Sequence, residues 1–125
     1  MAVSVGTDII EIQRIHAVIE RHGERFLKKL YSAKEIEYCQ KHQYAYRNFA
    51  GRFAGKEAVV KALGTGFGKD YSFLDIEILN ESTGKPVVYI KGEKRDDIAL
   101  SISHCKEYAT ATAIYAALTS NIYSA

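Results

Sequence analysis

The apolar positions at the start of the chain first follow the period of a strand and then that of a helix. Between Val3 and Ile10 they alternate with polar or small residues, which predicts a strand with one buried face and with Asp8 on the opposite face near its far end. From Ile12 they recur at three- and four-residue steps as far as Ile19, and Gly23 is the expected stop. A strand followed by an amphipathic helix is therefore predicted.

Two shorter helices are expected next. Glu24 to Tyr31 has the pattern of a short helix, and Ser32 and Glu35 have the spacing of a capping box that opens another helix, from Glu35 to about His42. These signals are structural and carry no chemistry of their own.

The stretch from Tyr46 to Gly66 is the centre of the predicted fold. It forms one apolar helical stripe, yet Glu57 and Lys61 fall inside that stripe. Because burying an unpaired charge costs several kcal/mol, the two residues are either a mutually satisfied ion pair or the wall of a polar site. Spacing alone does not decide between them, since Glu at i and Lys at i+4 also pair on ordinary helix surfaces.

A glycine-rich segment, Gly64-Thr65-Gly66-Phe67-Gly68, ends this helix. One glycine would be a routine helix cap, whereas alternating glycines allow a backbone to approach a ligand closely. Since the glycines follow the helix, neither the dinucleotide-binding nor the Walker pattern fits.

The second half of the chain is expected to be β-structure. Asp75 to Leu79 and Val87 to Ile90 predict one hairpin, and Ile98 to Ser103 and Tyr108 to Leu118 predict a second, with His104 in its turn. The fold class is therefore α+β, with an N-terminal strand and helices followed by an antiparallel sheet of hairpins. Residues 1–118 are expected to form a single domain, and residues 119–125 a loosely ordered tail.

Composition agrees with one modest core, because the 125 residues are 47% hydrophobic. The net charge of +2 does not by itself indicate nucleic-acid binding, although basic residues cluster between Arg14 and Lys41 and between Lys91 and Arg95. With neither a leader pattern nor a long apolar run, we expect a soluble, cytoplasmic protein without a membrane segment.

Candidate chemistry is sparse before any resemblance is considered. Cys39 and Cys105 lack metal-like spacing and are expected to be reduced thiols, so a zinc site is not expected. Asp8 alone has the position of a helix cap or turn residue. The basic rim of the first helix, with Arg14, Arg21 and Arg25, could dock an acidic protein.

Four collinear motifs resemble the bacterial holo-[acyl carrier protein] synthases, the short 4′-phosphopantetheinyl transferases. They are GTDIIEIQRI from Gly6, FAGRFAGKEAVVKALGTG from Phe49, FLDIEILNESTGKP from Phe73 and SISHCKEYATATAI from Ser101. The resemblance covers nearly the whole chain in order and leaves out only the tail.

The resemblance implies transfer of phosphopantetheine from coenzyme A to a serine of apo acyl carrier protein, with release of adenosine 3′,5′-bisphosphate, in fatty acid biosynthesis. It implies Mg²⁺ bound by Asp8 and Glu57, with Lys61 as the third catalytic residue. The residues implied to border coenzyme A are Arg52, Lys61, Gly64, Thr65, Gly66, Lys85, Pro86 and His104. Arg52 and His104 are suited to the 3′-phosphate or the ribose. The serine proton would pass to Glu57 or to Asp8 through a metal-bound water.

The same resemblance implies a carrier-protein surface at Arg14 and Arg21, and a homotrimer with active sites at the subunit interfaces. Gly51 and Gly55 depart from the family pattern, in which both positions are usually alanine; each glycine costs up to about 1 kcal/mol in a helix interior. Two other functions are alternatives: a magnesium-dependent nucleotide hydrolase, which would use the same carboxylates, and a non-catalytic RNA-binding module built on the basic, tyrosine-containing segments.

Overall fold

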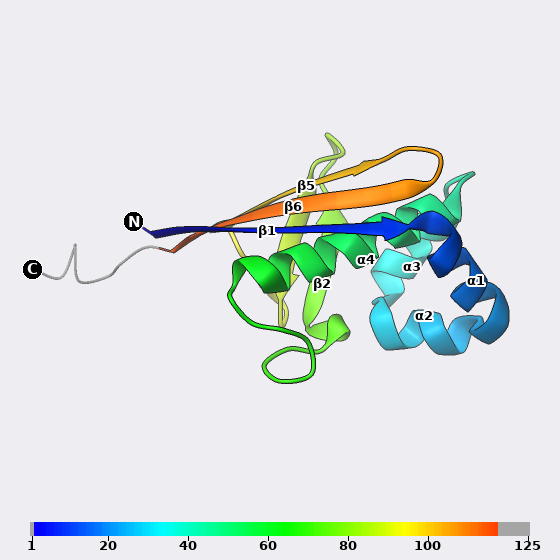
Figure 1. Cartoon of the computed structure of the whole chain (residues 1–125), viewed down its shortest axis with the longest axis horizontal. Helices are drawn as coiled ribbons and strands as arrows, with labels where there is room; N and C mark the ends of the chain where they lie inside the picture. Colours follow the sequence, from blue (N-terminus) through cyan, green and yellow to red (C-terminus); the bar gives the residue numbers. More distant parts are fainter. Residues whose placement is uncertain (1, 118–125) are drawn as a thin grey trace, which may run out of the picture.

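The computed structural model describes residues 2–117 and has four α-helices and six strands (Figure 1). The elements, in chain order, are β1 (Ala2–Glu11), α1 (Ile12–His22), α2 (Glu24–Leu30), α3 (Ala33–Gln40), α4 (Ala45–Ala62), the 3₁₀ turn η1 (Phe73–Asp75), β2 (Ile76–Asn80), β3 (Pro86–Ile90), β4 (Glu93–Lys94), β5 (Ile98–His104) and β6 (Tyr108–Ala117). The predicted α+β class is confirmed.

The strands form two antiparallel sheets of three strands each, in the orders β1-β6-β5 and β2-β3-β4. The first strand therefore pairs with the last: Ala2 lies opposite Ala117, and Asp8 lies opposite Ala111. Helices α1, α2 and α3 gather beyond one end of this long sheet, and α4 runs along it (Figure 1).

Helix α4 lies at the centre of the core and is buried almost all round. Its buried residues include Ala54, Ala58 and Val59, together with the charged residues Arg52 and Lys56. It packs against both sheets, since it contacts β1, β5, β6 and β2. A helix in this position has no fully solvent-exposed face, which is why its apolar stripe is less distinct in the structure than its sequence suggested.

Most predicted helix limits agree with the structure. Gly23 ends α1 with φ of 55°, a left-handed backbone that favours glycine. The capping box at the start of α3 is present, with Ser32 accepting from the Glu35 amide and Glu35 accepting from the Ser32 amide. No helix within residues 2–117 combines the length and the apolarity needed to cross a membrane.

The buried face of β1 is the opposite of the one that its pattern suggested. Gly6 and Ile10 are buried against the helices, whereas Val3, Val5 and Ile9 are 65%, 63% and 65% exposed. The reason is that α4 packs very close to β1. Only the face of β1 that carries Gly6 has room for the helix, because glycine has no side chain. An exposed apolar strip therefore remains on the outer face of the sheet.

Two further details differ from the sequence-based expectation. His104, expected in a turn, is the last residue of β5, and the short strand β4 and the turn η1 have no clear sequence signal. The predicted loose tail at residues 119–125 lies outside the described residues.

Candidate active site

Asp8 and Lys61 meet where β1 crosses α4. Gly6 allows this crossing, because a Cβ at that position would lie 2.0 Å from the Ala58 carbonyl oxygen and 2.5 Å from the Ala62 amide nitrogen. Lys61 Nζ donates to the Thr7 carbonyl oxygen over 3.0 Å and lies 3.3 Å from Asp8 Oδ1. The strand and the helix thus bring together two charged residues that are 53 positions apart in sequence.

Glu57 belongs to the same cluster. Partial burial raises the pKa of its carboxyl, the negative charge of Asp8 raises it further, and the positive charge of Lys61 lowers it. Lys61 pairs with Asp8 across two elements, so of the two possibilities left open by the sequence, the structure favours the wall of a polar site. The prediction that Asp8, Glu57 and Lys61 form one cluster is in keeping with these contacts.

Two neighbouring carboxylates are suited to a divalent cation. Mg²⁺ takes oxygen ligands and is commonly held by one or two carboxylates together with waters and substrate phosphates. Within residues 2–117, no group of three or more His, Cys, Asp or Glu side chains is arranged to hold a metal. The donor set of Asp8 and Glu57 therefore fits a cation shared with a phosphate better than a closed protein site.

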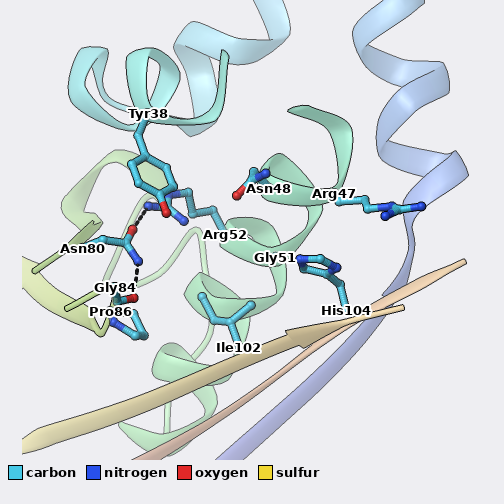
Figure 2. Close-up of a pocket in the computed structure, with 10 residues that line it drawn as sticks. All are labelled: Tyr38, Arg47, Asn48, Gly51, Arg52, Asn80, Gly84, Pro86, Ile102 and His104. Atoms are coloured by element: carbon cyan, nitrogen blue, oxygen red, sulfur yellow. Dashed lines mark hydrogen bonds between the residues drawn. The ribbon is translucent and has the colours of Figure 1, made fainter. Parts of the chain in front are cut away.

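A cavity of about 230 Å³ lies on another side of α4, between α3, α4 and β5 (Figure 2). Arg47, Gly51 and Arg52 line it from α4, and Ile102 and His104 line it from β5. The other lining residues are Tyr38, Asn48, Asn80, Gly84 and Pro86. The cavity is smaller than the roughly 300–1,000 Å³ of most small-molecule sites, so it has room for part of a large ligand.

Arg52 is held firmly in this cavity. One of its terminal nitrogens donates to Asn80 Oδ1, and Asn80 Nδ2 donates in turn to the Gly84 carbonyl oxygen over 2.8 Å (Figure 2). The Tyr38 ring lies 4.3 Å from the guanidinium carbon. Arg52 Nε is buried and has no hydrogen-bond partner among the described residues, so this guanidinium keeps one unpaired donor.

His104 adds a third basic side chain to this cavity. Its ring rises from β5 towards α4 beside Gly51 (Figure 2). Together with Arg52 it makes the cavity suitable for an anion, because arginine and protonated histidine donate charge-assisted hydrogen bonds. The guanidinium of Arg47 lies over the Tyr44 ring and points away from Arg52 in Figure 2. The structure brings together the predicted residues Arg52, Pro86 and His104 at this second location.

The remaining predicted cofactor residues lie outside both groups. Thr65 lines a different cavity, near Tyr71 and Lys91, and its hydroxyl hydrogen-bonds to Asp70. Gly64 and Gly66 belong to the same loop after α4. Lys85 lines a separate surface cavity with Glu81 and Arg95.

The two arginines predicted to contact a partner, Arg14 and Arg21, lie on α1 and are exposed. A second basic area adjoins them, where His22, Arg25 and Lys29 surround Phe26 at the junction of α1 and α2. The exposed side of these helices is therefore basic, as the sequence predicted.

Sequence reasoning missed several residues of the site. Arg47, Asn48 and Gly51 share one face of α4 with Arg52, and this helical spacing was a usable signal. The buried Lys56 is a second omission: its Nζ lies 2.8 Å from Glu35 Oε1, and both side chains are fully buried. That charge pair, rather than Glu57 and Lys61, occupies the interior.

Comparison with known proteins places these features in a family context. Residues 4–113 match the model of the 4′-phosphopantetheinyl transferase superfamily. A holo-[acyl-carrier-protein] synthase from Protochlamydia amoebophila is 48% identical over 120 residues, which cover 92% of this chain and 98% of that protein. The corresponding protein of Chlamydia pneumoniae is 51% identical over 118 residues, covering 90% and 95%.

Solved structures with the same fold include coenzyme A complexes. A holo-(acyl-carrier-protein) synthase from Bacillus anthracis in complex with CoA (3′,5′-ADP) is 36% identical with a TM-score of 0.80, and the match covers 94% of this chain and 100% of that one. The Helicobacter pylori holo-[acyl-carrier-protein] synthase in complex with coenzyme A is 37% identical with a TM-score of 0.78, covering 87% and 96%.

Proposed function

Because this chain belongs to the 4′-phosphopantetheinyl transferase superfamily, we propose that it is a holo-[acyl-carrier-protein] synthase. It transfers 4′-phosphopantetheine from coenzyme A to a serine of apo acyl carrier protein and releases adenosine 3′,5′-bisphosphate. Relatives that share about half of its residues carry this name. We expect the reaction to serve fatty acid biosynthesis in the cytoplasm.

The observation that carries the proposal is the cluster of Asp8, Glu57 and Lys61. Asp8 and Glu57 would hold Mg²⁺, which, when bound, neutralises the charge that builds up on the pyrophosphate oxygens during phosphoryl transfer. Lys61 lies beside Asp8 and can contact the same phosphates. Glu57 or Asp8 would accept the proton of the attacking serine.

The cavity lined by Arg52 and His104 would bind the other end of coenzyme A. Its basic side chains suit the 3′-phosphate or the ribose. The cavity is too small for the whole cofactor, so the pantetheine arm and the pyrophosphate must lie elsewhere. The glycine loop at Gly64 to Gly66 and the Lys85–Pro86 pair are the proposed neighbours of the remaining cofactor atoms.

A homotrimer with active sites at the subunit interfaces would supply further surface for coenzyme A, which the cavity of one chain is too small to enclose. Val3, Val5 and Ile9 form a strip that is exposed in a single chain, and Ile114 on the neighbouring β6 is 44% exposed. An apolar strip on a sheet is typical of a protein interface. Burial of this strip against a second copy would bring another chain next to β1, the strand that bears Asp8.

The acyl carrier protein would dock on α1 through Arg14 and Arg21. This feature separates the proposal from a magnesium-dependent nucleotide hydrolase, which would use the same carboxylates without a protein-docking surface. Charge reversal by R14E/R21E is expected to slow modification of the carrier protein while leaving coenzyme A binding intact.

The decisive experiment is a mass measurement of apo carrier protein after incubation with coenzyme A, Mg²⁺ and this protein. A gain of one phosphopantetheine group is expected. Asp8→Asn and Glu57→Gln should each slow the gain by at least about 100-fold, whereas Glu37→Gln, which changes an exposed carboxylate on α3, should not. Unchanged mass with the unmodified enzyme would refute the proposal.

A further inference from the structure

The wall of the Arg52–His104 cavity contains an unusual contact between a helix glycine and a strand isoleucine. Gly51 lines the cavity from α4 and Ile102 lines it from β5. A Cβ placed on Gly51 would lie 2.9 Å from Ile102 Cγ2, which is closer than real Cβ atoms come to a neighbour. Ile102 thus occupies the space that an alanine at position 51 would need.

Ile102 lies between the cavity and the α4 backbone. Its Cγ2 stands where a side chain at position 51 would begin, and its Cδ1 stands 3.4 Å from where a Cβ on Gly55 would be. Protein interiors are packed densely, so an added methyl group must be accommodated by a shift of its neighbours. The cavity, which Ile102 lines in Figure 2, is one space into which such a shift can move its side chain.

The same contact sets the distance between the charged groups of the cavity. Ile102 and His104 lie on one face of β5, two residues apart, and Arg47 and Arg52 lie on α4 on either side of Gly51. A methyl group between Gly51 and Ile102 would therefore either push Ile102 into the cavity or move β5, and His104 with it, away from the arginines. Both changes impair binding of an anion that needs both Arg52 and His104.

We propose that Gly51 and Ile102 are specificity-determining residues, which together keep the cavity open for an adenosine that carries a phosphate on its ribose in addition to the 5′-phosphate. The inference rests on the proposed function, because that function assigns this cavity to the 3′-phosphate end of coenzyme A. Gly51 and Ile102 do not take part in the chemistry; they act by preserving room and spacing. The glycine at position 51, which departs from the family pattern, is required by this particular packing.

The test is calorimetric titration of the full-length protein with adenosine 3′,5′-bisphosphate and with adenosine 5′-monophosphate. The unmodified protein is expected to prefer the bisphosphate. Gly51→Ala should weaken binding of the bisphosphate about tenfold and change binding of the monophosphate less than about twofold, because only the bisphosphate places a charged group in the cavity. Ser101→Ala, which changes an exposed side chain on the opposite face of β5 from Ile102, should leave the preference unchanged.

Two more variants test the contact from the side of β5. Leucine has no Cγ2 methyl group, so G51A/I102L should restore the preference to within about twofold of the unmodified protein. Ile102→Phe places a larger side chain into the cavity without adding a methyl group to α4, and it should reproduce the selective loss. Each variant is first checked for folding by its thermal unfolding transition; Ile102→Phe provides the test if Gly51→Ala does not fold.

The outcomes separate the inference from the function on which it rests. An unmodified protein that binds both nucleotides equally would overturn the assignment of the cavity to the 3′-phosphate, and the inference with it. A preference that is present in the unmodified protein and unchanged in folded Gly51→Ala or Ile102→Phe would overturn the inference alone. An equal loss for both nucleotides in these variants would also contradict it.

Discussion

At the scale of single residues, Lys56 and Glu35 form an ion pair in which both side chains are fully buried. Each charge depends on its partner, because burial removes its contact with water. Lys56 Nζ donates to Glu35 and to the carbonyl oxygens of Leu30 and Phe73, and the second Glu35 oxygen accepts from the Ile78 amide. The pair therefore joins α2, α3, η1 and β2 to α4, one residue before Glu57. Removal of one partner would leave the other charge buried without compensation.

Lys56→Met is expected to lower the free energy of unfolding by about 3–5 kcal/mol, because the Glu35 carboxylate would lose its cation. Chemical unfolding in urea measures the change. The matched control is Lys28→Met: its 3.6 Å pair with Glu24 is largely exposed, so the expected change is below about 1 kcal/mol. Equal effects of the two substitutions would contradict the role given to the buried pair.

The two cysteines should differ sharply in reactivity. Burial raises the pKa of the Cys39 thiol to about 12, whereas backbone N–H groups of Glu107 and Tyr108 lower the pKa of exposed Cys105. Since the thiolate is the reactive form, iodoacetamide at pH 8 should label Cys105 in the native protein and spare Cys39. Because its pKa is lowered, Cys105 should reach half of its maximal labelling rate at a lower pH than an unperturbed cysteine thiol does.

Mass spectrometry counts the labels. Cys105→Ser should show no label in the native state and one label in urea, where Cys39 becomes accessible. Native labelling of Cys105→Ser at an appreciable rate would mean that Cys39 is not buried in solution.

Several site residues could be predicted from the sequence, and others could not. The charges of Glu57 and Lys61 on an apolar stripe indicated either an ion pair or a polar site. Only the resemblance linked them to Asp8, because no local pattern encodes a contact over 53 positions. Ile102 was unpredictable for the same reason, since its role depends on how β5 packs against α4. Its partner Gly51 was noticed only as a departure from the family pattern.

At the scale of elements, the crossing of β1 and α4 determines where Asp8 lies relative to Glu57, the other carboxylate proposed to bind Mg²⁺. Gly6 lies directly against the α4 backbone, and Asp8 follows two residues later on the same face. Any side chain at position 6 would force the strand and the helix apart, because backbone atoms of a packed helix cannot move aside. Gly6 thus fixes the position of Asp8 indirectly, because it sets the distance between β1 and α4.

Gly6→Ala is expected to lower the free energy of unfolding by at least about 2 kcal/mol and, in the folded fraction, to slow transfer by about 100-fold. The physical reason is displacement of Asp8 from Glu57 and Lys61. Gly66→Ala is the control for stability alone, because a Cβ there meets nothing within 4 Å; its free energy of unfolding should change by less than about 0.5 kcal/mol. Urea unfolding and the carrier-protein mass assay measure both properties.

Local patterns predicted most of the elements. Period, the glycine stop at Gly23 and the capping box at Ser32 identified α1 to α3, and alternation identified both hairpins. The buried face of β1 was predicted wrongly, because alternation shows that a strand has two unlike faces without showing which one the core covers. The two-residue strand β4 is too short to leave a pattern.

At the scale of the whole molecule, the exposed strip of Val3, Val5 and Ile9 should control assembly. Val5→Asp is expected to convert a trimer to monomers, because a carboxylate would have to be desolvated within an apolar interface. The single chain should stay folded, since Val5 is 63% exposed in it. Light scattering after gel filtration measures the molar mass, which should be three times that of one chain before the substitution.

Leu74→Asp provides the comparison, since Leu74 is also an exposed large apolar residue, at 49%, but lies on η1. It should leave the mass at three chains. A monomeric protein before any substitution, or a trimer that survives Val5→Asp, would remove the support for an interface on this face.

The pairing of β1 with β6 has a consequence for the order in which the enzyme is made. The strand bearing Asp8 leaves the ribosome well before the strand that lies opposite it, Tyr108–Ala117, which is the last described element. The aspartate therefore cannot be held in its observed position until residues 108–117 have also been synthesised. A nascent chain released early, with every other acidic and basic group of the site already translated, would still be an inactive one.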